Sequence, residues 1–254
     1  MNFSLFFLAS AAIVSTVSGK CDIPAAAEYV ILAKTGISTV PQSLITGNIA
    51  ASPIASTAIT GFTLIIDSSN MFSTSTQVTG NVYAPDYTGG SDLITVISQM
   101  ETAYDDAASR DTSANVADSN LGGQTLESGV YTFDVDVSIS GGDLTFSGSA
   151  TDVFIIQTSK NIIQAAATNV ILAGGAKAEN IFWSVAQEVN IGAGAHMKGI
   201  LLAATAVKFI TGSNFVGRVL AATAVTIQQA TITDPTAATS SQPTRRGLRG
   251  LQVA

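Results

Sequence analysis

Two aspartates are spaced as a chemical site would require. Asp134 and Asp136 alternate in the stretch TFDVDVSIS, so on a β-strand both carboxylates would point to the same face. Paired carboxylates on one face could serve glycoside cleavage or calcium binding. No third acid, Lys or Arg repeats beside them, which favours a solvated polar row over a catalytic or metal site.

The single histidine and the single cysteine restrict the possible chemistry further. His196 lies in the Gly/Ala-rich turn GAGAHMKG, where a solvated side chain is the expected role, and one histidine leaves little scope for zinc or for a Ser/His/Asp triad. Cys21 has no partner cysteine in the chain, so packing and backbone hydrogen bonds must hold the fold, and pairing between two molecules stays open. We predict no catalytic residues, no metal and no cofactor.

A four-residue pattern does repeat: Thr, a small residue, an apolar residue, then Thr, Ser or Lys. The apolar member would point inward and the flanking polar members outward. The copies are Thr35-Gly36-Ile37-Ser38, Thr205-Ala206-Val207-Lys208, Thr223-Ala224-Val225-Thr226 and, more loosely, Thr76-Gln77-Val78-Thr79. Gln187 falls in the first outward row, and Ser138 and Asn190 fall in the second. Stacked strands lie about 4.7 to 4.9 Å apart, so these rows would form a flat lattice of hydroxyls and methyls, although strand propensity alone also favours Thr.

These rows must be positioned by a structural repeat of eighteen residues, which we call a coil, meaning one turn of a solenoid. Three consecutive stretches align at that period: IFWSVAQEVNIGAGAHMK, GILLAATAVKFITGSNFV and GRVLAATAVTIQQATITD. Apolar residues coincide at alternate positions, with Val189, Val207 and Val225 at one and Ile191, Phe209 and Ile227 at the other. Eighteen residues divide into three short strands with small residues at the corners, and fixed self-similarity is the mark of a solenoid. We therefore predict a mainly β fold, a three-sided parallel β-helix.

The two ends of the chain share this coil pattern. VILAKTGIS near the N-terminus matches VLAATAVT near the C-terminus, with Leu32 opposite Leu220 and Thr35 opposite Thr223. Solenoid neighbours must bury one another's faces. We expect the N-terminal and C-terminal coils to be interleaved or adjacent.

One segment has helical spacing instead. In SDLITVISQMETAYDDAASR the apolar stripe consists of Leu93, Ile97, Met100, Tyr104 and Ala107. We predict a helix over about 91–110, with Ser91 as N-cap, lying along one flank of the solenoid with Asp105 and Asp106 in water. Residues 111–123 are predicted to form a loop.

Composition and the chain ends set the remaining expectations. Hydrophobic residues make up 46% and charged residues 11%, so a sizeable core is available, and the net charge of −7 disfavours nucleic acid. The apolar run that ends in Ser18 and Gly19 predicts a signal peptide over 1–19 and a secreted protein with no membrane contact once it is cleaved. We expect one domain over 20–233, a disordered tail over 234–254, and a monomer with no small-molecule substrate.

Several stretches resemble a known family. YVILAKTGISTVPQSLITGNIAASP, TSTQVTGNVYAPDY, METAYDDAASR and NIFWSVAQEVNIGAGAHMKGILLAATAVKF are similar to the secreted ice-binding (antifreeze) proteins of the DUF3494 type, over roughly Ala25 to Thr233. Members are right-handed three-sided β-helices with a long helix alongside and a flat ice-binding face, often marked by Thr-Ala/Gly-X-Thr/Asn. Lys208 stands where that pattern usually has Thr or Asn.

The resemblance implies adsorption to an ice surface and inhibition of ice growth and recrystallisation, with no turnover. Together with the outward rows, it gives the expected ice-binding residues: Thr35, Ser38, Thr76, Thr79, Ser138, Gln187, Asn190, Thr205, Lys208, Thr223 and Thr226. Two other classes stay open. A carbohydrate-active β-helix enzyme would need a cleft of clustered acidic and basic residues, and a cell-surface adhesin module an exposed aromatic row or an anchoring tail.

Overall fold

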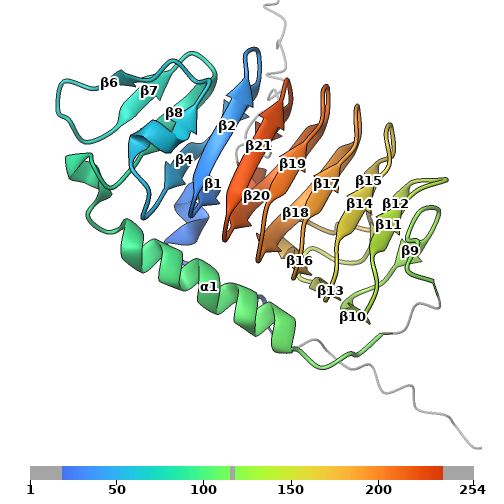
Figure 1. The fold of residues 1–254 in the computed structure, drawn as a ribbon. Coiled ribbons are helices and arrows are strands. Elements are labelled where there is room, and N and C mark those ends of the chain that lie inside the picture. Colours follow the sequence, from blue (N-terminus) through green and yellow to red (C-terminus); the bar gives the residue numbers. More distant parts are fainter. Residues whose placement is uncertain (1–18, 115–117, 237–254) are drawn as a thin grey trace, which may run out of the picture.

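The computed structural model describes residues 19–114 and 118–236. Parallel strands stack into a three-sided β-helix, and one long helix lies along it (Figure 1). The predicted signal peptide, apart from Gly19, and residues 237–254 of the predicted tail lie outside the described residues. Within the described residues, no helix is both long enough and apolar enough to cross a membrane.

Each side of the solenoid is one stack of strands. The helix-covered side consists, in stacking order, of β10 (Gly129–Phe133), β13 (Phe154–Thr158), β16 (Ile181–Val185), β18 (His196–Ala203), β20 (Asn214–Ala221), β1 (Tyr29–Ala33), β4 (Asn48–Ala51) and β8 (Val78–Tyr83). The second side, which we call the hydroxyl side, consists of β11 (Val137–Ile139), β14 (Ile162–Gln164), β17 (Val189–Ile191), β19 (Val207–Phe209), β21 (Ala224–Gln228), β2 (Gly36–Val40) and β5 (Ile59–Thr60).

The third side begins with a short sheet and continues through the first halves of the longest strands. Its members are β9 (Thr125–Leu126), β12 (Leu144–Ser147), β15 (Val170–Ala173), the starts of β18 and β20, β22 (Thr231–Thr233), β3 (Leu44–Thr46) and the start of β8. A parallel bridge between Asn169 and His196 joins β15 to β18. Short 3-10 turns occur at η1 (Ala26–Glu28), η2 (Ser56–Ala58), η3 (Thr88–Gly90) and η4 (Ala178–Asn180).

The eighteen-residue register is confirmed. Val189 pairs with Val207, and Val207 with Val225, on three successive coils. These valines are buried, because alternate strand residues point to opposite faces and the inward set stacks from coil to coil.

The predicted meeting of the two chain ends is also confirmed. Leu32 of β1 pairs with Leu220 of β20, and the main-chain N–H of Thr35 donates to the carbonyl of Thr223 at 3.2 Å. The blue N-terminal strands therefore lie directly beside the orange-red C-terminal strands (Figure 1). The last coil of the chain is sandwiched between its first coil and the coils that precede it.

The interior is filled by aromatic and branched side chains. Trp183 is fully buried and meets Phe146 edge to face, with ring centroids 5.6 Å apart. Its indole N–H donates to the carbonyl of Lys198 at 3.0 Å, so the one polar atom of the ring is satisfied inside the core. Trp183 is thus a core residue.

The helix α1 (Leu93–Ser109) packs on the helix-covered side (Figure 1). Its buried residues are Leu93, Val96, Ile97, Met100, Ala103 and Ala107. Tyr104, expected in this stripe, is only half-buried, because Ala103 lies nearer the stripe's centre. The expected N-cap is wrong: Asp92, not Ser91, precedes the first turn, and its side chain makes no capping hydrogen bond.

The N-terminal segment packs against the end of this helix. Cys21 is fully buried, which leaves no exposed thiol for pairing between folded molecules. Asp106 was expected to face water, but it accepts hydrogen bonds from the Nε and NH2 groups of Arg110, both at 2.8 Å. Those bonds hold the pKa of the Asp106 carboxyl below its ordinary value.

Because the thiol of Cys21 is buried in its neutral form, the free energy of unfolding should fall at alkaline pH. Burial, reinforced by the nearby carboxylate of Asp106, raises the pKa of its thiol from 9.0 to about 12. The contribution of this thiol to stability is present below pH 9 and is lost as the pH rises from 9 toward 12, because the unfolded chain releases the proton first. Urea unfolding across this range should show a smaller alkaline loss for Cys21→Ala than for the wild type. An equal loss in both would show that the thiol does not ionise on unfolding.

The chain end beyond β22 takes part in the fold, which corrects the expected start of the tail. Arg218 is 6% exposed, and its NH2 group lies 3.0 Å from a carboxylate oxygen of Asp234. Its Nε donates to the carbonyl of Ala27 at 2.8 Å. One guanidinium thus ties η1, β20 and the segment after β22 together.

Removing the side chain of Asp234 should destabilise the fold because it leaves the guanidinium of Arg218 buried without its charge partner. We expect Asp234→Ala to lower the free energy of unfolding by about 3–5 kcal/mol, measured by urea denaturation. The matched control is Glu179→Ala, which breaks the more exposed Lys177–Glu179 pair at 3.6 Å and should cost less than about 1 kcal/mol. Equal costs for the two variants would contradict the clamp role of Arg218.

Candidate functional site

The hydroxyl side presents one outward residue from the middle of each strand. We call this set the central row: Thr60, Ser38, Thr226, Lys208, Asn190, Ile163 and Ser138, in stacking order. Each pairs with its neighbour in register along the stack. The predicted alignment of Ser38, Lys208, Thr226, Asn190 and Ser138 on one side is therefore present in the structure.

The first outward residues of the repeated pattern lie at the adjacent corner. We call this set the corner row: Thr57, Thr35, Thr223, Thr205, Gln187, Lys160 and Val135, three positions before each member of the central row. Thr35 and Gln187 are exposed, and Thr205 and Thr223 are half-buried. Small residues separate the two rows on the Thr-bearing coils, namely Ala58, Gly36, Ala224 and Ala206. Nothing bulky stands between the hydroxyls there.

The hydroxyls of these rows are largely left to solvent. The hydroxyl of Ser38 donates to that of Thr226 at 3.4 Å, linking two successive coils. By contrast, inward or buried threonines bond the main chain; Thr158 donates to the carbonyl of Val135 and Thr168 to that of Ala165. The outward threonines retain donor and acceptor capacity for water.

Thr57 and Thr60 belong to this side, although they were not among the residues predicted from the sequence. Thr57-Ala58-Ile59-Thr60 fits the repeated pattern, and Ser38 pairs with Thr60 across β2 and β5. The signal was present in the sequence. This copy of the pattern, Thr57 to Thr60, lies one coil beyond the copy at Thr35 to Ser38. It was missed because no eighteen-residue period connects it to the other copies.

The expectation that Thr76 and Thr79 share the face is wrong. Thr79 pairs with Thr46 on the third side, and Thr76 lies in the turn before β8. The physical reason is an inserted antiparallel hairpin, β6 (Ile65–Ile66) and β7 (Ser73–Ser75), which lies between β5 and β8 and caps the solenoid. The insertion carries the next copy of the pattern to a different side.

The side chains of the central row change from hydroxyl-bearing to charged and apolar along the stack. The three coils nearest β5 offer only hydroxyls, whereas the next carries Lys208, whose ammonium group forms an ion pair with Glu188. Further along, Ile163 is 44% exposed and stands in the same row. The hydroxyl lattice is densest at the β5 end of the solenoid, where the N-terminal coils stack on the last coil.

At the opposite end the side extends one coil further than expected. Asn120 forms a parallel bridge with Ser138, and its carboxamide oxygen accepts from the main-chain N–H of Ser140 at 3.1 Å. Leu121 is fully buried below it. Part of the predicted loop over 111–123 therefore closes the solenoid.

The paired aspartates of the sequence, Asp134 and Asp136, show no catalytic geometry. Asp134 is exposed, and the carboxylate of Asp136 accepts from the main-chain N–H and the side-chain amide of Asn161 at 3.0 and 2.8 Å. These bonds lower the pKa of Asp136 and join two coils. His196 is exposed at the start of β18. Across residues 19–114 and 118–236, no group of three or more His, Cys, Asp or Glu side chains could hold a metal ion.

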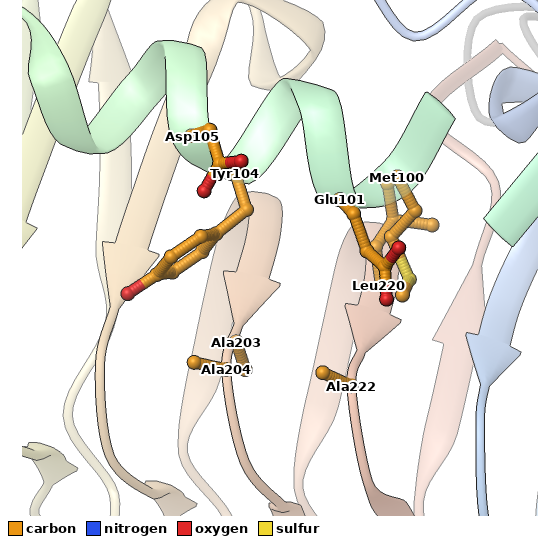
Figure 2. A pocket seen from close by; sticks show the side chains of 8 residues that line it. All are labelled: Met100, Glu101, Tyr104, Asp105, Ala203, Ala204, Leu220 and Ala222. Atoms are coloured by element: carbon orange, nitrogen blue, oxygen red, sulfur yellow. The ribbon is translucent and has the colours of Figure 1, made fainter. Parts of the chain in front are cut away.

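A hollow of about 270 Å³ lies under α1 (Figure 2). Tyr104, Glu101 and Met100 reach down from the helix over a floor of alanines, Ala203, Ala204 and Ala222. Glu101 is held in an ion pair at 2.5 Å by Lys34, the residue before Thr35. This contact fastens the helix to the coil that carries Thr35.

A three-sided parallel β-helix with one flanking helix and a row of outward hydroxyls is the architecture expected of the ice-binding proteins. The ice-binding-like family model matches residues 31–233, and the chain belongs to this family.

Its relatives are similar over most of their length. The chain is 45% identical over 215 residues to ice-binding protein K1-A of Typhula ishikariensis, covering 81% of this chain and 88% of that protein. It is 39% identical over 240 residues to the ice-binding protein of Leucosporidium sp. (strain AY30), covering 91% and 92%. Among solved structures, the ice-binding protein LeIBP from an Arctic yeast, described for its antifreeze activity, matches with a TM-score of 0.82 at 40% identity, covering 85% of this chain and 94% of that one.

Proposed function

We propose that this protein is secreted and binds ice through the hydroxyl side, and that bound molecules slow the growth and recrystallisation of ice. The observation that carries the proposal is the register of Thr60, Ser38 and Thr226, three outward hydroxyl residues on consecutive coils. Membership of the ice-binding family supports it. The proposal involves no catalysis and no cofactor.

Ice is an ordered array of water, so a protein can hold it only through many weak and regularly spaced contacts. Such contacts add up to useful affinity only where the surface loses little conformational freedom on binding. Stacked strands about 4.8 Å apart provide a rigid frame. Threonine suits it because the β-branch restricts χ1, while its hydroxyl can join a bridging water network.

Adsorbed molecules would pin the ice front at separate points. The front must then bulge outward between them, and a convex surface melts at a lower temperature than a flat one. Growth is therefore arrested over a range below the melting point, which is measured as thermal hysteresis.

A single ice crystal held near its melting point in purified protein tests the function. We expect faceted growth, a measurable hysteresis gap and slow recrystallisation of annealed ice. Round crystals that grow without facets, at a protein concentration where the chain is folded, would reject ice binding.

The Lys208–Glu188 pair should limit activity. Charged groups hold liquid-like hydration, and this pair interrupts the hydroxyl lattice at the fourth coil. The double variant Lys208→Thr with Glu188→Ala restores the pattern of the neighbouring coils and leaves no unpaired charge. We expect its hysteresis to exceed that of the wild type at equal concentration.

The control is Lys177→Thr with Glu179→Ala, which removes another ion pair outside the hydroxyl side. It should leave hysteresis unchanged. A decrease in the Lys208/Glu188 variant would mean that the charged pair itself contacts ice.

A further inference from the structure

The third side carries a shorter row of threonines that no part of the proposed site uses. We propose that Thr79, Thr46 and Thr233, here called the third-side row, form a second ice-binding row. The inference rests on the proposed function and extends it to a second face of the same molecule.

The three threonines are stacked on consecutive coils. Thr46 pairs with Thr79 between β3 and β8, and Thr233 pairs with Thr46 between β22 and β3. Thr79 is exposed, and the other two are half-buried. The row ends at Val216, which pairs with Thr233 on the next coil. It therefore repeats the strand-to-strand spacing of the central row over three coils.

The hydroxyls of this row are available. Among the described residues, none of the three threonine side chains donates to or accepts from another protein group, whereas Thr39, on the hydroxyl side but pointing inward, donates to Ser43 at 2.8 Å. Outward hydroxyls without a protein partner must be satisfied by water. Outward threonines in register on three coils are the same feature that supports the central row.

The row is held rigidly by the corner that follows it. Thr46 and Thr79 directly precede Gly47 and Gly80, which have positive φ values of 127° and 150°. A Cβ atom on Gly80 would lie only 2.6 Å from the carbonyl oxygen of Gly47, so backbone packs on backbone here. Thr233 precedes Asp234, the carboxylate that Arg218 holds. Neither end of the row can shift without breaking these contacts.

The same three coils carry both rows. Thr79, Thr46 and Thr233 stand on the third side of the coils that present Thr60, Ser38 and Thr226 on the hydroxyl side. The remaining side of the solenoid is covered by α1 (Figure 1). Two sides of a prism meet ice in different orientations, so a second row would add crystal planes to those bound through the first.

Fluorescently labelled protein adsorbed to a single ice hemisphere tests the inference. We compare the wild type with Thr46→Tyr, with Thr226→Tyr, and with Thr145→Tyr as a matched control at the far end of the third side. Thermal unfolding confirms that each variant is folded. We expect Thr46→Tyr and Thr226→Tyr to lose different subsets of the labelled planes, and Thr145→Tyr to label all of them.

The second row is overturned if Thr46→Tyr labels the same planes as the wild type, or if Thr145→Tyr loses the planes that Thr46→Tyr loses. In both cases the wild-type protein still labels ice, so the proposed ice-binding function is retained. Absence of labelling by the wild type would instead reject the proposed function itself. These outcomes separate failure of the second row from failure of ice binding.

Discussion

Replacing Thr226 by Tyr should lower ice affinity at least about tenfold, equivalent to about 1.4 kcal/mol, and should remove most of the thermal hysteresis. Thr226 stands between Ser38 and Lys208 in the central row. A Tyr ring there would project above the plane and hold ice away from the neighbouring hydroxyls as well as from its own position. Residues at the centre of a contact surface carry a large share of its binding energy.

The fold should survive this change because the side chain at position 226 points outward and substitutions at such positions cost little stability. The matched control is Thr102→Tyr on the exposed face of α1, which should retain wild-type hysteresis. If Thr226→Tyr kept full activity while remaining folded, the hydroxyl side would not be the ice-binding surface.

Replacing Gly217 by Ala should cost more than about 4 kcal/mol or prevent folding altogether. Gly217 forms the corner between the third side and the helix-covered side, with φ at +159°. A Cβ atom there would lie 1.7 Å from the carbonyl oxygen of Gly199 on the coil before, so the two coils would have to separate.

The control for this substitution is Gly194→Ala. Gly194 also has a positive φ, +63°, but a Cβ atom would meet nothing within 4 Å. Its cost should be limited to backbone strain, about 1–2 kcal/mol. Equal free energies of unfolding for the two variants, by urea denaturation, would contradict close packing of the corners.

The regular coils were predictable because their length repeats. A period of eighteen residues places Val189, Val207 and Val225 on one strand position, and the structure pairs them. The match between Leu32 and Leu220 predicted the contact between the chain ends for the same reason. In both cases the pattern of inward side chains determines the register.

The irregular coils were not predictable in the same way. Once the β6–β7 hairpin is inserted, counting residues from Thr60 no longer shows which side the next strand joins, and Thr79 was placed on the wrong one. The end of the ordered fold was placed too early because Asp234 is held by the side chain of Arg218 and by the main-chain carbonyl of Thr46, both distant in sequence. Pairwise contacts of this kind leave no periodic pattern in the sequence.

Transfer of proton magnetisation from ice to threonine methyl groups, in a frozen solution of protein labelled at Thr, is the most direct test of the proposed surface. Only side chains in contact with the ice lattice receive magnetisation quickly. We expect fast transfer to Thr60, Thr223 and Thr226 and slow transfer to Thr102 on the helix. Equal rates at Thr226 and Thr102, or faster transfer at Thr102, would contradict binding through the hydroxyl side.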